Sequence, residues 1–223
     1  MPQDLDTLLV PTITHGRVLV RRPAGNAVGL LAGFHGYAED AATQLERLVA
    51  IPGTDRWLLV SIQALHRFYR GRSKDVVAGW MTHQDRDVAI LDNLAYVDAA
   101  IERALQDVAT RATVPIVYAG FSQGVAMAFR AGLRGRQPTA GVIAVGGDVP
   151  PELREDPHAR FPRTLLIRGT GDDWYTAAKL DADVAAIEAR GGQVKSVVFD
   201  GGHEWTAAVS AVGGEFLSGL LSR

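Results

Sequence analysis

The chain contains no cysteine. This absence excludes disulfide bonds, thiolate nucleophiles and cysteine-ligated zinc or iron–sulfur sites, and it gives no indication of an oxidising compartment. No apolar run approaches the ~18 residues that a membrane-spanning helix needs. The first ten residues, MPQDLDTLLV, lack the basic and long apolar regions of a signal peptide. We therefore expect a cytoplasmic protein without stable membrane insertion.

An excess of charge of one sign is also lacking. The formal net charge is −2, so the basic surface typical of nucleic-acid binding is not expected. The sequence has neither a P-loop nor a dinucleotide-binding fingerprint, and we expect no cofactor. His83, Asp85 and Asp87 are close in sequence, but their spacing matches no strong ligand pattern, so no metal is expected.

What is present is a globular composition with short apolar runs. The 223 residues are 47% hydrophobic and 22% charged, which suits one domain spanning 1–223 and leaves no room for a separate cap domain. Continuous apolar runs predict strands buried on both faces of a sheet. The expected strands are Gly16–Arg22 (near an edge), Val28–Phe34, Arg56–Ile62, Val114–Tyr118, Ala140–Gly147, Arg163–Gly169 and Gln193–Asp200.

Helical segments alternate with these strands. The expected helices are Glu39–Ala50, Asp87–Thr110, Gln123–Arg134, Thr176–Arg190 and about Glu204–Leu221. This alternation predicts an α/β fold, with a mostly parallel sheet and helices on both faces. The segment Gln63–Thr82 shows no clear period and is predicted to be a long loop, which in a compact domain is usually functional.

The sequence Gly120-Phe121-Ser122-Gln123-Gly124 joins an expected strand to an expected helix. A serine at the apex of so tight a turn needs glycine two residues before and two after it. The turn exposes the hydroxyl and aims the N–H groups of the helix N-terminus at the same place. This pattern predicts a nucleophile elbow with Ser122 as nucleophile, and the alternative is a glycine-rich turn with an incidental serine.

A serine nucleophile needs a base, and the base needs a group that fixes its tautomer. In a parallel sheet these groups lie at the carboxyl ends of the strands. Of the six histidines, His203 follows the last strand and lies downstream of the serine, so it is the predicted base. His35 also follows a strand, but it precedes the serine and its His-Gly context suits a different task.

The acid has more than one candidate. Asp172 follows the Arg163–Gly169 strand, and the small residues before it let the loop turn back toward the histidine. Asp148 follows the preceding strand and would also give the chain order Ser…Asp…His. Asp173 is adjacent to Asp172 and would point elsewhere. We predict Asp172 as the acid, with turn or helix capping as the alternative role of Asp148.

The oxyanion of an acyl-transfer intermediate needs preorganised N–H donors. One predicted donor is the amide of Gln123, directly after the nucleophile. The other is the amide of Tyr37, because Gly36 permits a tight turn after the Val28–Phe34 strand. The alternative for His35-Gly36 is an ordinary strand-ending turn.

These motifs together resemble the phospholipase/carboxylesterase family of α/β hydrolases, which includes bacterial carboxylesterases and acyl-protein thioesterases. The resemblance runs from about Gly29 to the C-terminus and is carried by Phe34-His35-Gly36-Tyr37, Gly120–Gly124, Gly169-Thr170-Gly171-Asp172 and Gly202-His203. It implies an α/β-hydrolase fold, the triad Ser122, Asp172 and His203, and the oxyanion donors Tyr37 and Gln123. Arg168, where the thioesterase branch usually has histidine, and Asp173-Trp174-Tyr175, in place of a proline-containing stretch, weaken the inference to acyl-protein substrates.

The substrate pocket is predicted from aromatic and apolar residues on the loops near the elbow. Trp80, which looks like the family's pocket tryptophan, Met81 and Trp174 are the expected lining residues. Phe68, Tyr69 and Tyr175 are either further pocket walls or loop anchors packed on the core. Arg67, Arg70, Arg72 and Lys74 are either a solvated basic loop or an attractant for acidic substrates or lipid headgroups.

The expected function is hydrolysis of carboxylic esters with small to medium acyl chains through an acyl-serine intermediate. The alternatives are a lysophospholipase or acyl thioesterase and, from another class, a non-catalytic binding protein with the same fold. The expected partners are a small-molecule ester and, at most, a second copy of the chain in a homodimer.

Overall fold

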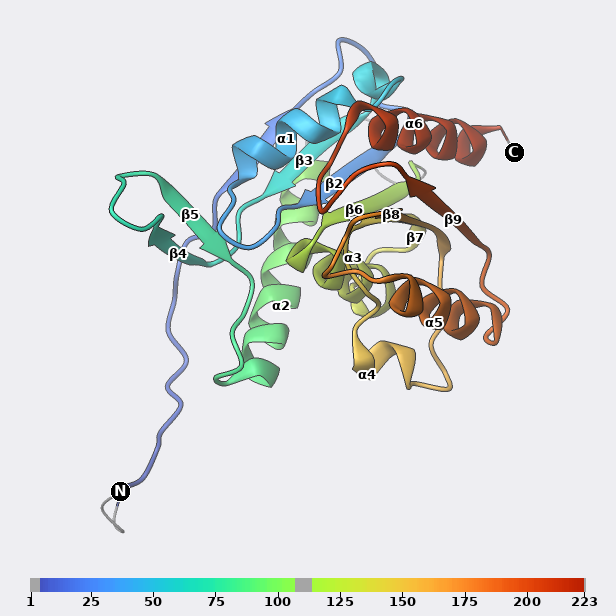
Figure 1. Cartoon of the computed structure of the whole chain (residues 1–223). Coiled ribbons are helices and arrows are strands. Elements are labelled where there is room, and N and C mark those ends of the chain that lie inside the picture. Colours follow the sequence, from blue (N-terminus) through green and yellow to red (C-terminus); the bar gives the residue numbers. More distant parts are fainter. Residues whose placement is uncertain (1–4, 107–113, 223) are drawn as a thin grey trace.

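A computed structural model describes residues 5–106 and 114–222. Within them a seven-stranded sheet has the order β1-β3-β2-β6-β7-β8-β9, and a separate two-stranded sheet pairs β4 with β5 (Figure 1). The strands are β1 (Val18–Arg21), β2 (Leu30–Phe34), β3 (Leu58–Ile62), β4 (His66–Tyr69), β5 (Val76–Gly79), β6 (Ile116–Phe121), β7 (Thr139–Val145), β8 (Arg163–Gly169) and β9 (Val194–Phe199). The helices are α1 (Ala41–Ala50), α2 (Arg86–Leu105), α3 (Gln123–Arg134), α4 (Pro151–Arg154), α5 (Ala177–Glu188) and α6 (Ala207–Leu221), with a 3-10 turn at Thr54–Arg56.

The large sheet confirms the predicted α/β class. All of its neighbouring strands are parallel except β1, which lies at one edge and pairs with β3 in antiparallel fashion. The expected strands and helices are present with shifts of a few residues at their ends. Residues 107–110 of the expected helix Asp87–Thr110 lie outside the described residues.

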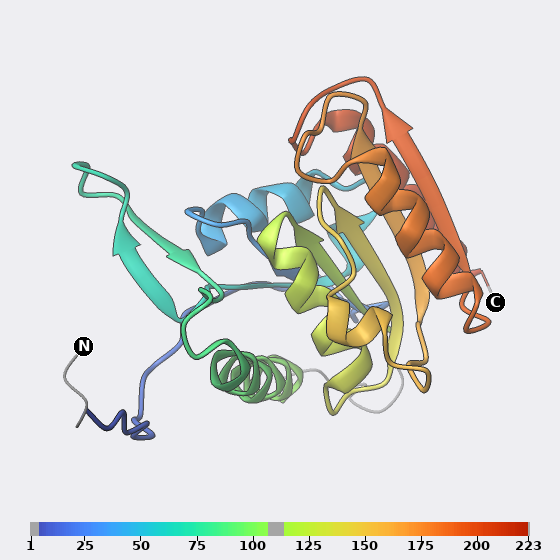
Figure 2. The same cartoon turned by 60° about the horizontal axis from the view of Figure 1, so that its bottom comes forward.

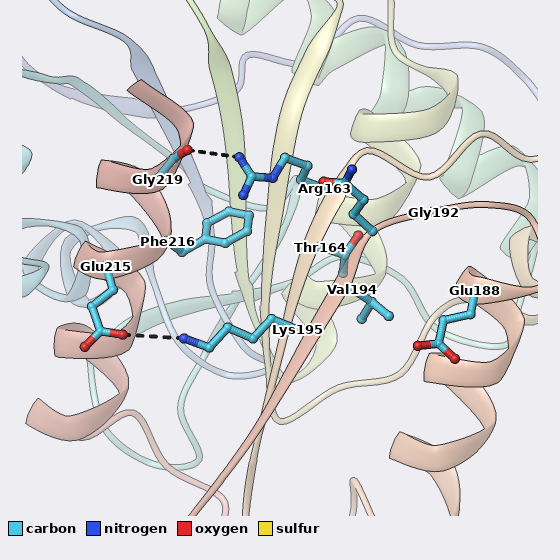
Figure 3. A pocket seen from close by; sticks show the side chains of 10 residues that line it. Arg163, Thr164, Glu188, Gly192, Val194, Lys195, Glu215, Phe216 and Gly219 are labelled. Carbon is cyan, nitrogen blue, oxygen red and sulfur yellow. Dashed lines mark hydrogen bonds and ion pairs between the residues drawn. The ribbon is translucent and has the colours of Figure 1, made fainter. Parts of the chain in front are cut away.

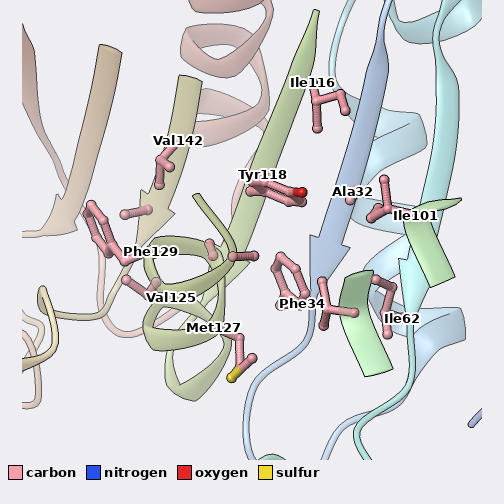
Figure 4. Close-up of a cluster of buried hydrophobic side chains, with 14 of the residues drawn as sticks. Ala32, Phe34, Ile62, Ile101, Ile116, Tyr118, Val125, Met127, Phe129 and Val142 are labelled. Atoms are coloured by element: carbon pink, nitrogen blue, oxygen red, sulfur yellow. The ribbon is translucent and has the colours of Figure 1, made fainter. Parts of the chain in front are cut away.

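The strands bury alternate residues on opposite faces of the sheet, as their pleat requires. Leu30, Ala32 and Phe34 join a core cluster with α2, α3 and α5, which Figure 4 shows in part. Leu31 of the same strand joins a second cluster with α1 and α6. Helices therefore cover both faces, and β2, β3 and β6 are buried along their full length.

The segment Gln63–Thr82 corrects the sequence prediction. It is not an irregular loop, because β4 and β5 form an antiparallel hairpin that pairs His66 with Gly79 and Tyr69 with Val76. Both views show the hairpin projecting from the body of the molecule (Figures 1 and 2). In the described residues no separate cap domain covers the sheet; this hairpin is inserted between β3 and α2.

Candidate active site

Ser122 lies at the apex of the turn between β6 and α3, in the strained conformation φ 52°, ψ −120°. A Cβ at Gly124 would lie 2.1 Å from the carbonyl oxygen of Phe34, and one at Gly120 would lie 2.5 Å from the carbonyl oxygen of Gly124. Both glycines are therefore required by close backbone contacts. The Ser122 N–H donates to the carbonyl of Val145 at the end of β7, which fixes the turn on the neighbouring strand (2.9 Å).

Asp172 and His203 meet at the carboxyl ends of β8 and β9. The His203 Nδ1 lies 2.9 Å from Asp172 Oδ2, and the other carboxylate oxygen accepts the backbone N–H groups of Trp174 and Tyr175, each at 2.9 Å. The Asp172 side chain is buried, whereas the His203 side chain is 25% exposed. A proton on Nδ1 shared with the carboxylate leaves Nε2 free to accept one.

The other acid candidates lie elsewhere. Asp148 is half-exposed and pairs with Lys179 at 3.6 Å, and Asp173 is exposed.

The loop after β7 brings the serine and the Asp–His pair together. A Cβ at Gly146 would lie 3.1 Å from the His203 ring and 3.3 Å from Asp172 Oδ2, and one at Gly147 would lie 2.6 Å from the carbonyl oxygen of Ser122. Gly146 also has a positive φ of 64°. A side chain at either glycine would thus collide with His203, Asp172 or the backbone of Ser122, so the three predicted triad residues all lie close to this stretch.

The predicted oxyanion loop packs on the elbow. The N–H of Gly36 donates to Glu39 Oε2 (2.8 Å) and the N–H of Ala38 donates to the carbonyl of Ala78 (3.0 Å). Within the described residues, the amide of Tyr37 between them donates to no protein acceptor, and neither does the amide of Gln123 in the first turn of α3. Both predicted donors are therefore available to a bound oxyanion.

Glu39 holds this loop through a second partner, which sequence reasoning missed. It forms a two-point ion pair with Arg47, both contacts at 2.6 Å. Burial alone would raise the pKa of Glu39, but the hydrogen bond and charge of Arg47 outweigh it, so the pKa lies below its ordinary value. The Arg47 guanidinium also lies 4.2 Å from the centre of the Phe121 ring, which packs against His203.

His35 is buried and is fixed as a neutral imidazole. Its Nδ1 donates to the Gly36 carbonyl (2.7 Å) and its Nε2 accepts the N–H of Ala64 (3.0 Å). Burial lowers the pKa of His35. Its ring therefore supports the oxyanion loop, in agreement with the expectation that His35 is not the base.

The predicted pocket residues have different surroundings. Trp80 is fully buried: its indole N–H donates to the carbonyl of His35 (2.9 Å), and its backbone N–H donates to the side chain of Gln123 (2.8 Å). The Gln123 side chain also donates to the carbonyl of Met81 (3.0 Å), which ties the residue after Ser122 to the end of the hairpin. Met81 is partly buried and Trp174 is 75% exposed. The roles of Trp80, Met81 and Trp174 as residues that line a substrate pocket remain predictions.

A cavity of about 550 Å³ lies at the opposite end of the sheet, where β8 and β9 begin (Figure 3). Lys195 pairs there with Glu215 at 3.4 Å, and Arg163 donates to the carbonyl of Gly219 at 3.0 Å. This cavity is remote from Ser122 and is not the predicted ester site. Among the described residues, no three metal-ligating side chains gather into a site, and none of the helices could cross a bilayer.

Comparison with known proteins identifies the family. A profile of the phospholipase/carboxylesterase family matches residues 75–188, just over half of the chain. The chain belongs to the phospholipase/carboxylesterase family. The matched range contains Ser122 and Asp172, while Tyr37 and His203 lie outside it. Membership in this family supports hydrolysis of esters or thioesters.

Solved structures show the same fold at low sequence identity. Esterase PE8 is 23% identical, covering 92% of this chain and 98% of its own, with a TM-score of 0.70. Acyl-protein thioesterase 2 from Zea mays is 18% identical, covering 93% of this chain and 100% of its own, with a TM-score of 0.70. The Bacillus cereus carboxylesterase is 14% identical, covering 92% of this chain and 94% of its own, with a TM-score of 0.65. None of the curated proteins matches the sequence at a significant level.

Proposed function

We propose that this member of the phospholipase/carboxylesterase family is a serine carboxylesterase that cleaves esters of small to medium acyl chains. The observation that carries the proposal is the 2.9 Å contact between His203 Nδ1 and a buried Asp172, packed on the same Gly146-Gly147 stretch as the backbone of the strained Ser122. A base oriented in this way, near a serine at the apex of a tight turn, is the arrangement that acyl transfer requires.

In the proposed reaction the Ser122 Oγ attacks the ester carbonyl carbon while its proton moves to His203 Nε2. The resulting oxyanion accepts hydrogen bonds from the backbone N–H groups of Tyr37 and Gln123, and Asp172 stabilises the His203 imidazolium. Cleavage of the carbon–oxygen bond releases the alcohol, which takes the proton from His203. Water, deprotonated by His203, then attacks the acyl-serine; His203 returns the proton to Ser122, and the acid is released.

The acyl-chain range rests on what surrounds this site. Met81 and Trp174 are the proposed walls, and no separate cap domain covers them in the described residues. Trp80 acts from behind the site, through its contacts with His35 and Gln123. An open site of this kind suits short chains, which need little enclosed apolar surface.

The test is hydrolysis of p-nitrophenyl esters from acetate to palmitate by the wild type and Ser122→Ala. We expect a loss of ~10³-fold or more in kcat/KM for the variant, and labelling of Ser122 by an alkylphosphonate in the wild type only. Ser218→Ala, on α6, is the matched control and should be unchanged. Equal, feeble rates of wild type and Ser122→Ala would contradict the proposal, and a preference for palmitate or for a thioester would replace it with the lysophospholipase or thioesterase alternative.

A further inference from the structure

Tyr175 contacts the predicted catalytic acid and is itself fixed at three points. Its backbone N–H donates to Asp172 Oδ1 (2.9 Å), and its carbonyl accepts from Arg168 Nε (2.8 Å). Its hydroxyl donates to Asp183 Oδ2 (3.0 Å). The side chain is 1% exposed, and its burial raises the pKa of Tyr175, so the hydroxyl keeps its proton and stays a donor.

Asp183 extends this support to a second loop. It lies on α5, is fully buried, and its Oδ2 also accepts the backbone N–H of Val149 (3.0 Å). Val149 follows the Gly146-Gly147 stretch that lies against His203, Asp172 and Ser122. One carboxylate therefore ties both loops at the acid side of the site to helix α5.

The charge of Asp183 is costly to bury, which sets this contact apart from ordinary loop packing. Burial, and to a smaller extent the charge of nearby Asp148, raises its pKa to about 6. The hydrogen bonds from Val149 and Tyr175, and Arg154 at 3.6 Å, act in the opposite direction. Above this pH the ionised carboxylate is a strong acceptor for both donors.

We propose that Tyr175 and Asp183 are positioning residues that hold the Asp172 loop so that the carboxylate meets His203. Asp183 fixes the Tyr175 ring, Arg168 fixes its carbonyl, and the Tyr175 amide then orients Asp172. The inference rests on the proposed esterase function, because it assigns these residues to the orientation of the acid in that reaction.

The first variant is Tyr175→Phe, which removes only the bond to Asp183. Rates are normalised to active sites by alkylphosphonate titration. We expect kcat for p-nitrophenyl acetate to fall by about tenfold with KM almost unchanged, as for an oriented group that is loosened rather than removed. The acidic limb of kcat/KM should also move to lower pH, because a misplaced Asp172 stabilises the His203 imidazolium less.

Two control variants separate positioning from general stability. Tyr96→Phe removes a hydroxyl that donates to the carbonyl of Arg17 (2.9 Å), far from the site. Asp98→Asn changes a carboxylate that accepts a hydrogen bond from the backbone N–H of Arg136 (2.9 Å). Both should leave kcat and the pH profile unchanged. Asp183→Asn should resemble Tyr175→Phe, and the double variant should lose no more than the larger single effect, because the two residues act through one contact.

A readout without turnover keeps the inference separate from the esterase proposal. The low-field proton resonance of His203 Nδ1–H should weaken or shift in Tyr175→Phe and Asp183→Asn but not in the controls. An active wild type with unchanged rates, pH profile and resonance in both variants would overturn the inference alone. An inactive, unlabelled wild type would overturn the esterase proposal, and the resonance would still decide whether Tyr175 and Asp183 orient Asp172. If Tyr175→Phe does not fold, the same measurements on Asp183→Asn test the inference.

Discussion

The loops on the two sides of Ser122 are held by different kinds of contact. On the acid side, Asp172, Tyr175 and Asp183 are 3%, 1% and 0% exposed and are joined by hydrogen bonds to side chains. On the oxyanion side, Tyr37 is 60% exposed and its ring packs against that of Phe68. Phe68 belongs to β4 of the hairpin, which projects from the body of the molecule (Figure 2). The backbone on either side of Tyr37 is fixed through Glu39 and Ala78, whereas the Tyr37 ring stays largely exposed.

This difference separates the demands of proton transfer from those of substrate binding. The proposed acid needs one geometry for every substrate, and buried side chains joined by hydrogen bonds hold it. The oxyanion donors need a fixed backbone only, which leaves the side chains of the hairpin free to vary with the substrate. Changes on the acid side should therefore lower kcat for all esters, whereas changes on the hairpin should alter the preference among them.

The largest effect is expected from Asp172→Asn. An amide at this position favours the wrong histidine tautomer, so kcat should fall by ~10³–10⁴-fold for every ester in the series. Asp148→Asn is the matched control and should change kcat by less than about twofold, since the ion pair of Asp148 with Lys179 is an exposed contact of small energy. Comparable losses in both variants would mean that the acid has been misassigned.

An intermediate effect is expected from Glu39→Gln, which tests the rigid part of the oxyanion side. The variant loses the ion pair with Arg47, and we expect kcat to fall by about tenfold and stability by about 1–2 kcal/mol, measured by urea unfolding. Glu46→Gln, on the exposed face of α1, is the control. No change in kcat would show that the loop needs no support from Glu39.

The pH dependence of this stabilisation has a definite sign. The folded-state pKa of Glu39 lies below the ordinary value of 4.5, so the contribution is present above that pH and is lost as the pH falls below it. The stability difference between wild type and Glu39→Gln should therefore shrink in acid. A difference that grows there would contradict the assigned ion pair.

The smallest effect is expected from Phe68→Ala on the hairpin. Its ring centre lies 5.5 Å from that of Tyr37, so its removal should raise KM for longer acyl esters by about threefold and leave the acetate ester unchanged. Tyr69→Ala, exposed on the same strand, should alter neither value. An equal fall in kcat for every ester would instead show that the hairpin contributes to catalysis rather than to substrate preference.

Much of the sheet could be predicted because its strands are buried on both faces. Leu30–Phe34 reads as a continuous apolar run, and the whole strand is buried. The hairpin could not be predicted in this way, since three of the four residues of β4 are exposed and show no alternation. The prediction of an irregular segment there was wrong because solvent-exposed pairing leaves no apolar period in the sequence.

The candidate site, like the fold, could be predicted from the sequence only in part. The loop motifs predicted which strand ends would carry Ser122, Asp172 and His203, since parallel strands bring these ends to one edge. Sequence could not show that the indole of Trp80 donates to the carbonyl of His35, forty-five residues away. Nor could it show that the Tyr175 hydroxyl meets Asp183, because that contact depends on how α5 packs. The catalytic roles themselves stay predictions until the variants are measured.

The position of β9 at the edge of the sheet bears on how this protein would lose activity on heating. His203 follows β9, which in the described part of the chain pairs with β8 alone, whereas Ser122 follows β6 in the interior of the sheet. Strands with fewer neighbours open at lower cost than central ones. Warming should therefore displace His203, the proposed base, from an otherwise folded molecule. The proposed esterase activity should then disappear several degrees before the circular dichroism signal does, and cooling from that interval should restore it in full.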